Sequence, residues 1–207
     1  MSRDLSLLHP RLRALAQRLV LECNARGLPV LVTDGFRSRA EQDALYARGR
    51  TAPGKIVTRV RWPDSAHCWG VAFDYCRNVP GREYDDRDDF FARVAEIAKP
   101  WGLAWGGDWK NFPDKPHLQL AAYMPGNSTA WLRRSYGDPE TFRKSWETEE
   151  ETMERWKTME DIPAGYYREQ AARLVREGVL RGRDDGSLDL TEDMLRTLLM
   201  AERIGKQ

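Results

Sequence analysis

The sequence predicts an α+β fold: a small antiparallel sheet with helices packed on one side, followed by a small helical unit. Apolar residues at helical spacing come first in the chain, in residues 8–23. Strand-like segments follow, and the last two lie close together around the turn Gly106-Gly107. This order of elements is typical of an antiparallel sheet that is covered by helices on one face.

The first elements can be placed individually. Gly27 stands where the C-terminal cap of the 8–23 helix belongs, and residues 30–33 predict a buried strand. Ser38 and Glu41 form an S-x-x-E capping box, which predicts a helix that runs to about Arg48. Residues 49–64 include Gly49, Pro53, Gly54 and Pro63, and they predict a loop.

The later elements complete the sheet. Residues 71–76 predict a second strand, and residues 87–99 predict a helix that Pro100 ends. Residues 103–105 and 117–120 predict two further strands, and a short helix is expected near residues 129–136.

The chain divides into three predicted parts. Residues 1–137 form a candidate catalytic domain. Residues 138–158 are dense in Glu, Lys, Arg and Thr, and they predict a charged linker that is helical or extended. Residues 159–207 predict a small helical domain that is only marginally long enough to fold alone.

Composition excludes some functions. The 33 Lys and Arg residues are balanced by 32 Asp and Glu residues, so no polycationic surface for nucleic acid is expected. No apolar run approaches the ~18 residues of a membrane span, and the first residues lack the apolar core of a secretory signal. We therefore expect a protein made in the cytoplasm, with neither nucleic acid nor membrane as a partner.

Two of the three histidines lie in polar surroundings that suit a metal site. A catalytic zinc takes three protein ligands and keeps one position for water, so His67, Asp74 and His117 are a suitable set. His67 and Asp74 are seven residues apart, and an odd separation points to opposite faces of a straight strand. The pair therefore requires a bend, for which Gly70 is the candidate. We interpret His9, which precedes Pro10, as a surface residue.

Hydrolysis also requires a base and a cation. Asp114 lies in a Pro-flanked loop three residues before His117, where it is the candidate general base. Arg37 is the best-placed cation for a developing oxyanion. Taken singly, these residues have other readings: Asp114 and Asp34 as turn residues, and Arg37 as a surface charge that pairs with Glu41.

Three segments together resemble the VanY-type and CwlK-type peptidoglycan peptidases. Their sequences are GFRSRAEQ at residues 35–42, SAHCWGVAFD at residues 65–74, and WGGDW at residues 105–109 followed by Asp114-x-x-His117. The second segment matches the family's S-x-H-x-x-G-x-A-x-D signature at every fixed position. All three occur in the family's order and cover residues 5 to about 125.

The resemblance implies a LAS/hedgehog-type metallopeptidase fold with Zn²⁺ held by His67, Asp74 and His117. It implies Asp114 as the general base and Arg37 as a substrate or transition-state contact. The resemblance further implies four residues on the substrate side: Ser65, Asp108, Trp109 and Gln42. Asp108 and Gln42 also have a structural reading.

The W-G-G-D-W segment and the early helix look most like the L-alanyl-D-glutamate endopeptidase branch, which includes phage endolysins. The expected function is zinc-dependent cleavage of the L-alanyl-D-glutamate bond of peptidoglycan stem peptides, during host lysis and after the membrane is permeabilised. The alternatives are a D-alanyl-D-alanine carboxypeptidase of the same family and a non-catalytic wall-binding relative. The catalytic residues present argue against the second alternative.

Residues 159–204 are similar to a single S-layer-homology repeat. The similarity lies in Asp161-Ile162-Pro163, an A-x-x-L helix, G-V-L-x-G from Gly178 and the turn at 185–186. Residues 189–191 depart from the repeat, which often has a proline there, and such repeats usually occur in threes. The resemblance implies a cell-wall polymer as partner, and a helical cap or dimerising unit is the alternative.

Overall fold

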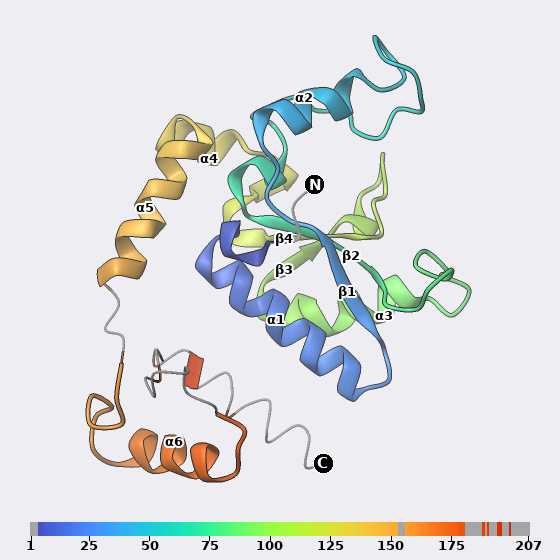
Figure 1. Cartoon of the computed structure of the whole chain (residues 1–207). Coiled ribbons are helices and arrows are strands. Elements are labelled where there is room, and N and C mark those ends of the chain that lie inside the picture. The colour runs from blue at the N-terminus through green and yellow to red at the C-terminus, as the bar shows by residue number, and fades with distance from the viewer. Residues whose placement is uncertain are drawn as a thin grey trace. The chain divides into compact units, whose positions relative to one another are not determined.

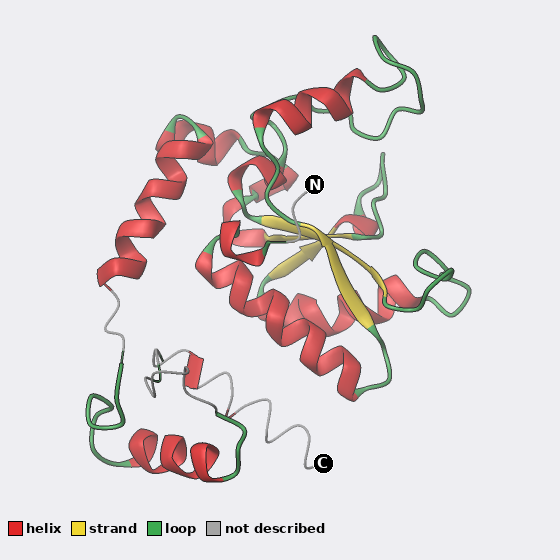
Figure 2. Cartoon of the chain, viewed as in Figure 1, coloured by secondary structure: helices red, strands yellow, loops and turns green. Residues whose placement is uncertain are grey.

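The computed structural model describes residues 4–152 and 156–180, together with residues 188, 190, 194, 195 and 199. The chain forms two compact units, residues 1–148 and residues 149–207. Figure 1 shows the elements of both units, and Figure 2 shows that the strands all belong to the first. Among the described helices, none has the length and apolar character that crossing a bilayer requires.

The first unit is built on a four-stranded antiparallel sheet, so the predicted fold class is confirmed. Its strands lie close to the predicted positions. In spatial order they are β1 (Val30–Asp34), β2 (Ala72–Arg77), β4 (His117–Leu120) and β3 (Leu103–Trp105).

Helices α1 (Pro10–Ala25) and α3 (Phe90–Ala98) cover one face of this sheet and lie below it in Figure 1. The strand side chains that join them in the apolar core alternate along β2 and β4: Phe73, Tyr75, Leu118 and Leu120. Because alternate residues of a strand point to opposite faces, Asp74, His117 and Gln119 face the other side. The period-two pattern therefore separates a core face from a polar face.

The polar face is bordered by the segment that follows β1. Helix α2 (Arg39–Ala47) begins with the predicted capping box: the Ser38 side chain accepts from the Glu41 amide, and Glu41 accepts from the Ser38 amide. Residues 48–65 then form a long loop before the short 3-10 helix Ala66–Trp69.

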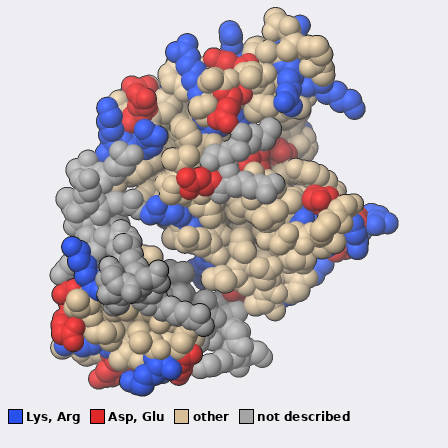
Figure 3. Space-filling model, viewed as in Figure 1, with Lys and Arg blue, Asp and Glu red and all other residues tan. Residues whose placement is uncertain are grey.

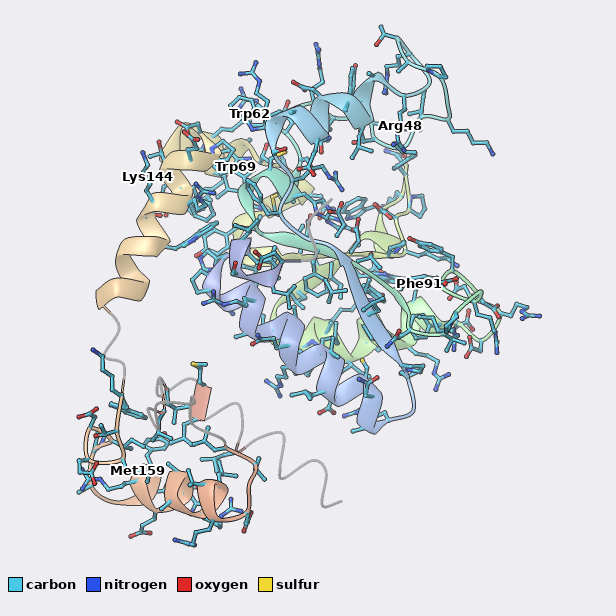
Figure 4. All side chains as sticks on the ribbon, in the orientation of Figure 1. Arg48, Trp62, Trp69, Phe91, Lys144 and Met159 are labelled. Carbon is cyan, nitrogen blue, oxygen red and sulfur yellow. The ribbon has the colours of Figure 1, made fainter. Side chains whose placement is uncertain are left out.

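Two helices close the first unit, α4 (Ala130–Tyr136) and α5 (Pro139–Thr152). Part of the segment predicted as a charged linker is therefore helical, and its Phe142 and Trp146 are buried in the main core. Figure 4 labels Trp69, whose ring lies 5.9 Å from the ring of Phe142. These apolar residues explain why the first turns of this charged segment pack against the main core.

The prediction that His9 lies on the surface is wrong, since only 8% of the residue is exposed. Its Nδ1 accepts from the Arg11 amide at 3.2 Å and so caps the first turn of α1. Its Nε2 lies 3.1 Å from the hydroxyl of Tyr123, and its ring packs on Trp146. This histidine is a structural part of the core.

The second unit has a small core of its own, around helix α6 (Tyr166–Arg176). Ile162, from the predicted D-I-P start, is fully buried, as are Ala171 and Leu174 of the predicted A-x-x-L helix. Val175, the next residue of this helix, is 41% exposed. The predicted turn at 185–186 lies outside the described residues, and so does residue 191, where the sequence also predicts that a last helix begins.

Candidate metal centre and active site

Three potential metal ligands converge on the polar face of the sheet. Asp74 of β2 stands directly opposite His117 of β4 in the antiparallel register. His67 lies on the 3-10 helix before β2, and Gly70 ends that helix in a left-handed conformation with φ of 66°. The predicted bend between His67 and Asp74 is thus found at Gly70, and it removes the problem of their odd separation.

The three donor atoms form a nearly equilateral triangle. His67 Nε2 lies 3.1 Å from His117 Nδ1, and Asp74 Oδ1 lies 3.3 Å from the first and 3.2 Å from the second. Tetrahedral ligands at zinc bond lengths of about 2.0–2.1 Å are separated by about 3.3 Å. The donor set therefore fits a single small divalent cation without rearrangement.

Hydrogen bonds behind the imidazoles orient both lone pairs toward this point. His67 Nδ1 lies 2.8 Å from the carbonyl oxygen of Gly35, which can only accept, so the proton sits on Nδ1. His117 Nε2 lies 3.0 Å from Oε1 of Gln119, whose amide nitrogen donates to Asn127. In the neutral imidazoles each ligating nitrogen is therefore the unprotonated one, as metal binding requires.

Asp74 is held as a carboxylate. Burial disfavours its charge, but in the absence of a metal the charge of His67 and hydrogen bonding with His117 and His67 outweigh burial and lower its pKa. A bound cation would take the place of these interactions. The ligand set therefore carries one negative charge against two neutral imidazoles, which leaves a bound divalent cation with a net charge of about +1.

Asp114 lies beside the ligands in a loop that backbone hydrogen bonds hold in place. Its amide donates to the carbonyl of Gly106 at 2.9 Å, and its own carbonyl accepts from the His117 amide at 3.2 Å. A Cβ on Gly106 would come within 2.4 Å of the Asp114 carbonyl oxygen, so this approach requires glycine. Among the described residues, none bonds to the Asp114 carboxylate.

The environment of Asp114 favours its neutral form. Burial, followed by repulsion from the Asp74 carboxylate, raises the pKa of Asp114, and the two imidazoles and Arg37 offset only part of this. A carboxylate with a raised pKa and no bonded partner is suited to accept a proton and to return it.

Arg37 is held beside the ligand Asp74 by two neighbouring side chains. Its Nη2 donates to Asp34 Oδ2 at 2.5 Å and lies 3.9 Å from Asp74 Oδ2. Its Nη1 donates to Gln42 Oε1 at 2.9 Å. Asp34, which we interpreted as a turn residue, is thus the buried counter-ion of Arg37, and the alternative pairing of Arg37 with Glu41 does not occur.

The predicted substrate contacts divide into two groups. Ser65 and Trp109 line the cavity of about 470 Å³ that contains the metal ligands, and the Trp109 ring centroid lies 5.0 Å from that of His117. Asp108 lies outside the lining and pairs with Lys99 at 3.0 Å. Gln42 is fully buried.

For Asp108 and Gln42, the contacts in the structure favour the structural reading. The side chain of Asp108 is directed to a surface ion pair, and the amide of Gln42 links Arg37 to the carbonyl of Val60 at 2.6 Å. The structural reading of Gln42 is the one that fits. Gln42 attaches the loop at the rim of the cavity to the arginine at its base.

Sequence reasoning missed Gln119, Asn127 and the acidic partner of Arg37. A signal for Gln119 was present, because residues two apart on a strand share a face and His117 was already a candidate ligand. No local pattern pointed to Asn127, which reaches Gln119 from a separate turn.

Together, two oriented imidazoles, a carboxylate ligand and a free neighbouring carboxylate define a mononuclear metallohydrolase. Residues 59–120 match the family model described as D-alanyl-D-alanine carboxypeptidase, of the M15 peptidases. The chain is 41% identical over 122 residues to the peptidoglycan L-alanyl-D-glutamate endopeptidase CwlK of Bacillus subtilis (strain 168). This match covers 55% of the chain and 73% of CwlK.

Two other relatives are similar over about the same length. The L-alanyl-D-glutamate peptidase of Listeria phage A118 is 30% identical over 111 residues, which is 52% of this chain and 36% of that protein. The crystal structure of the L-Ala D-Glu endopeptidase ChiX of Serratia marcescens has 27% identity and a TM-score of 0.41, covering 56% of this chain and 83% of ChiX. By its match to CwlK, the chain belongs to the M15 family of metallopeptidases.

Proposed function

We propose that this protein is a zinc-dependent endopeptidase that hydrolyses the L-alanyl-D-glutamate bond of peptidoglycan stem peptides. The observation that carries the proposal is the triangle of donors from His67, Asp74 and His117, with the unbonded Asp114 carboxylate beside it. The bond assignment is supported by the similarity to CwlK, which acts on this bond by its name.

Zinc is the proposed ion because two imidazoles and one carboxylate at tetrahedral spacing are a donor set that zinc prefers. When bound, it supplies Lewis-acid chemistry, which lowers the pKa of a water molecule and polarises the scissile carbonyl. His67, Asp74 and His117 would hold it, and the hydrogen bonds from Gly35 and Gln119 keep both imidazoles in the required tautomer.

Asp114 performs the proton transfers in this proposal. Its carboxylate accepts the proton of the attacking water, and it returns this proton to the nitrogen of D-glutamate as the amide bond breaks. Burial raises the pKa of Asp114, which makes its carboxylate a stronger base for the first half of the transfer. Arg37, held by Asp34, supplies positive charge near the oxyanion.

A D-alanyl-D-alanine carboxypeptidase is the second candidate, favoured by the description of the matching family model. Digestion of purified peptidoglycan followed by end-group analysis separates the two. New L-alanine C-termini together with D-glutamate N-termini support the endopeptidase, whereas release of free D-alanine supports the carboxypeptidase. A wall-binding relative without catalysis would give neither product.

We also propose that the enzyme acts as an endolysin, reaching the wall from the cytoplasm once the membrane is permeabilised. The support is the similarity to a peptidase of a Listeria phage. For the second unit we propose binding to a cell-wall polymer, on the basis of its S-layer-homology-like sequence and its separate core. Sedimentation of the full chain with purified walls, compared with walls stripped of secondary polymer, tests this role.

A further inference from the structure

The cavity that contains the metal ligands is lined by carboxylates and by two arginines among its described residues. Each lining carboxylate except Asp114 has a partner: Asp34 is bonded to Arg37, Asp64 to Arg133 at 2.8 Å, and Asp74 to the two imidazoles. Arg37 therefore already has an acidic partner within the protein. The second arginine, Arg59, has no such partner.

Arg59 is exposed and forms no ion pair with any described residue. Its guanidinium instead lies 4.6 Å from the centroid of the Phe112 ring, whose residue is 38% exposed and also lines the cavity. Stacking on an aromatic ring fixes the plane of a guanidinium and leaves its edges free to donate hydrogen bonds. The guanidinium of Arg59 is thus held in place at the cavity, and its N–H groups are available to bind a ligand.

The stacking joins two loops across the rim. Arg59 belongs to the loop after α2, and Phe112 belongs to the connection between β3 and β4, which rises toward that loop in Figure 1. The same connection carries Asp114, two residues from Phe112. Because Asp114 protonates the leaving nitrogen in the proposed reaction, this loop borders the leaving-group side of the scissile bond.

The leaving residue carries a charge that matches Arg59. Glutamate has two carboxyl groups, and the continuing stem peptide uses only one of them, so the other is free when it is not amidated. Cleavage of the L-alanyl-D-glutamate bond frees the amino nitrogen of D-glutamate. The α-carboxyl group of that residue is attached to the same carbon as this leaving nitrogen. Arg59 lines the same cavity as Asp114 and is held by the loop that carries Asp114, so it lies on the side of the cavity where a carboxylate on this carbon is presented.

We propose that Arg59, held on Phe112, binds the free carboxylate of the D-glutamate residue and makes the enzyme selective for stem peptides in which this group is not amidated. The assignment rests on the proposed L-alanyl-D-glutamate specificity. It gives the loop after α2 a role in substrate choice that is separate from metal binding and proton transfer.

The charge of the surrounding loop supports an anionic substrate. Residues 48–61 contain Arg48, Arg50, Lys55, Arg59 and Arg61, and no acidic residue. All five are exposed, and Figure 4 labels Arg48 at the start of the loop. Figure 3 shows Lys and Arg side chains over the same part of the face. Such a concentration of one charge increases the local concentration of anionic ligands.

The test compares two synthetic substrates that differ in one group. Both contain the L-alanyl-D-glutamate bond, and in one of them the free carboxylate of glutamate is replaced by a carboxamide. A hydrogen-bonded charge pair at a ligand changes affinity by on the order of 10- to 100-fold. We expect the zinc-loaded wild type to have a kcat/KM ratio of this size in favour of the carboxylate.

Substitution of Arg59 should abolish this preference. In R59Q the ratio should fall to about 1, and in R59K, which keeps the charge but not the planar fork, it should be intermediate. R61Q is the matched control, because Arg61 is in the same loop but stacks on Tyr46 outside the cavity. Because Arg61 contributes only to the general positive charge of the loop, the R61Q ratio should stay within about twofold of the wild-type ratio.

Two results would overturn the inference: a wild type that does not distinguish the substrates, or an R59Q variant that keeps the wild-type ratio. Failure of the proposed function looks different, because the wild type would then cleave neither substrate, and the basis of the inference would be removed with it. Zinc content and thermal midpoint, measured for each variant, identify any loss that comes from misfolding.

Discussion

Asp74 and Asp114 are identical side chains that their surroundings adapt to opposite tasks. In the metal-free protein, the charge of His67 and hydrogen bonding with His117 and His67 outweigh burial, lower the pKa of Asp74 and keep it ionised. Asp114 receives no such bonds from the described residues, and burial and the neighbouring charge of Asp74 raise its pKa. Pairs of carboxyl groups with pKa values pushed apart are a frequent mark of acid–base catalysis.

Replacement of Asp114 by Asn should remove the proton carrier while leaving the ligands intact. We expect kcat/KM to fall by about 100- to 10,000-fold, since this is the usual contribution of general acid–base catalysis. Bound metal should remain at the wild-type level. Asp108 provides a matched control, because D108N changes the same chemistry at a surface ion pair, and it should retain the wild-type rate. Normal turnover in D114N would show that another group carries the proton.

Gln119 should tune the metal site through His117. In Q119L the Nε2–H of His117 loses its acceptor, and loss of such a partner typically weakens metal binding about 10- to 100-fold. Q119E keeps an acceptor oxygen and should remain close to the wild type. Competition with a chelator of known affinity measures both. Equal affinities for Q119L and the wild type would contradict the role assigned to Gln119.

At the scale of elements, the site depends on how two helices end and begin. Gly70 ends the 3-10 helix that carries His67, and it lets the chain enter β2 at once. His9 begins α1 by accepting the Arg11 amide, and it packs against Trp146 of α5. Both residues connect the ligand-bearing segment to the core, because the His9 amide also donates to the carbonyl of Gly70 at 2.9 Å.

A comparison of Gly70 with Gly27 separates the cost of backbone strain from the cost of a steric clash when alanine replaces glycine. Both have φ near +70°, so alanine at either position costs about 1–2 kcal/mol of strain. Around Gly27 there is open space, whereas a Cβ at Gly70 would lie 3.0 Å from the Leu7 carbonyl oxygen and from the Trp146 ring. G70A should therefore reduce the free energy of unfolding by more than G27A does. Equal losses in denaturant titrations would argue against this close contact.

The cap of α1 should make stability depend on pH. Burial, together with the charge of Arg11, lowers the pKa of His9 from 6.5 to about 4. The unfolded chain therefore binds the proton more readily, and the stabilisation present above pH 6.5 is lost as pH falls toward 4. Relative to H9Q, the wild type should lose about 2 kcal/mol of unfolding free energy between pH 7 and pH 5. Parallel pH profiles for the two proteins would contradict this assignment.

Across the whole molecule, the sequence predicted what local patterns determine. The capping box at Ser38, the bend at Gly70 and the alternation along β2 and β4 all depend on residues a few positions apart. The environments of His9 and Gln42 were not predictable in this way. His9 is bonded to Tyr123, 114 positions away, and Gln42 is buried by a loop whose course no periodic pattern specifies.

The division into two units also has physical causes. The first unit has a large core that joins α1, α3 and the sheet, and it contains every residue of the proposed site. The second unit has its own buried residues, including Ile162 and Leu174. The proposed catalysis thus belongs to the first unit, and any wall attachment belongs to the second. Substitutions in one unit can therefore test one function without changing the core of the other unit.

The central claim is that one zinc ion, held by His67, Asp74 and His117, is required for peptidoglycan cleavage. Zinc X-ray absorption on the loaded full chain, with activity recorded on the same samples, tests it most directly. We predict one zinc per chain with two imidazole ligands at about 2.0–2.1 Å. Zinc and activity should be lost together in H117A or after chelation, and both should return when zinc is added back to the chelated wild type. Full activity in the zinc-free protein, or unchanged zinc coordination in H117A, would contradict the account.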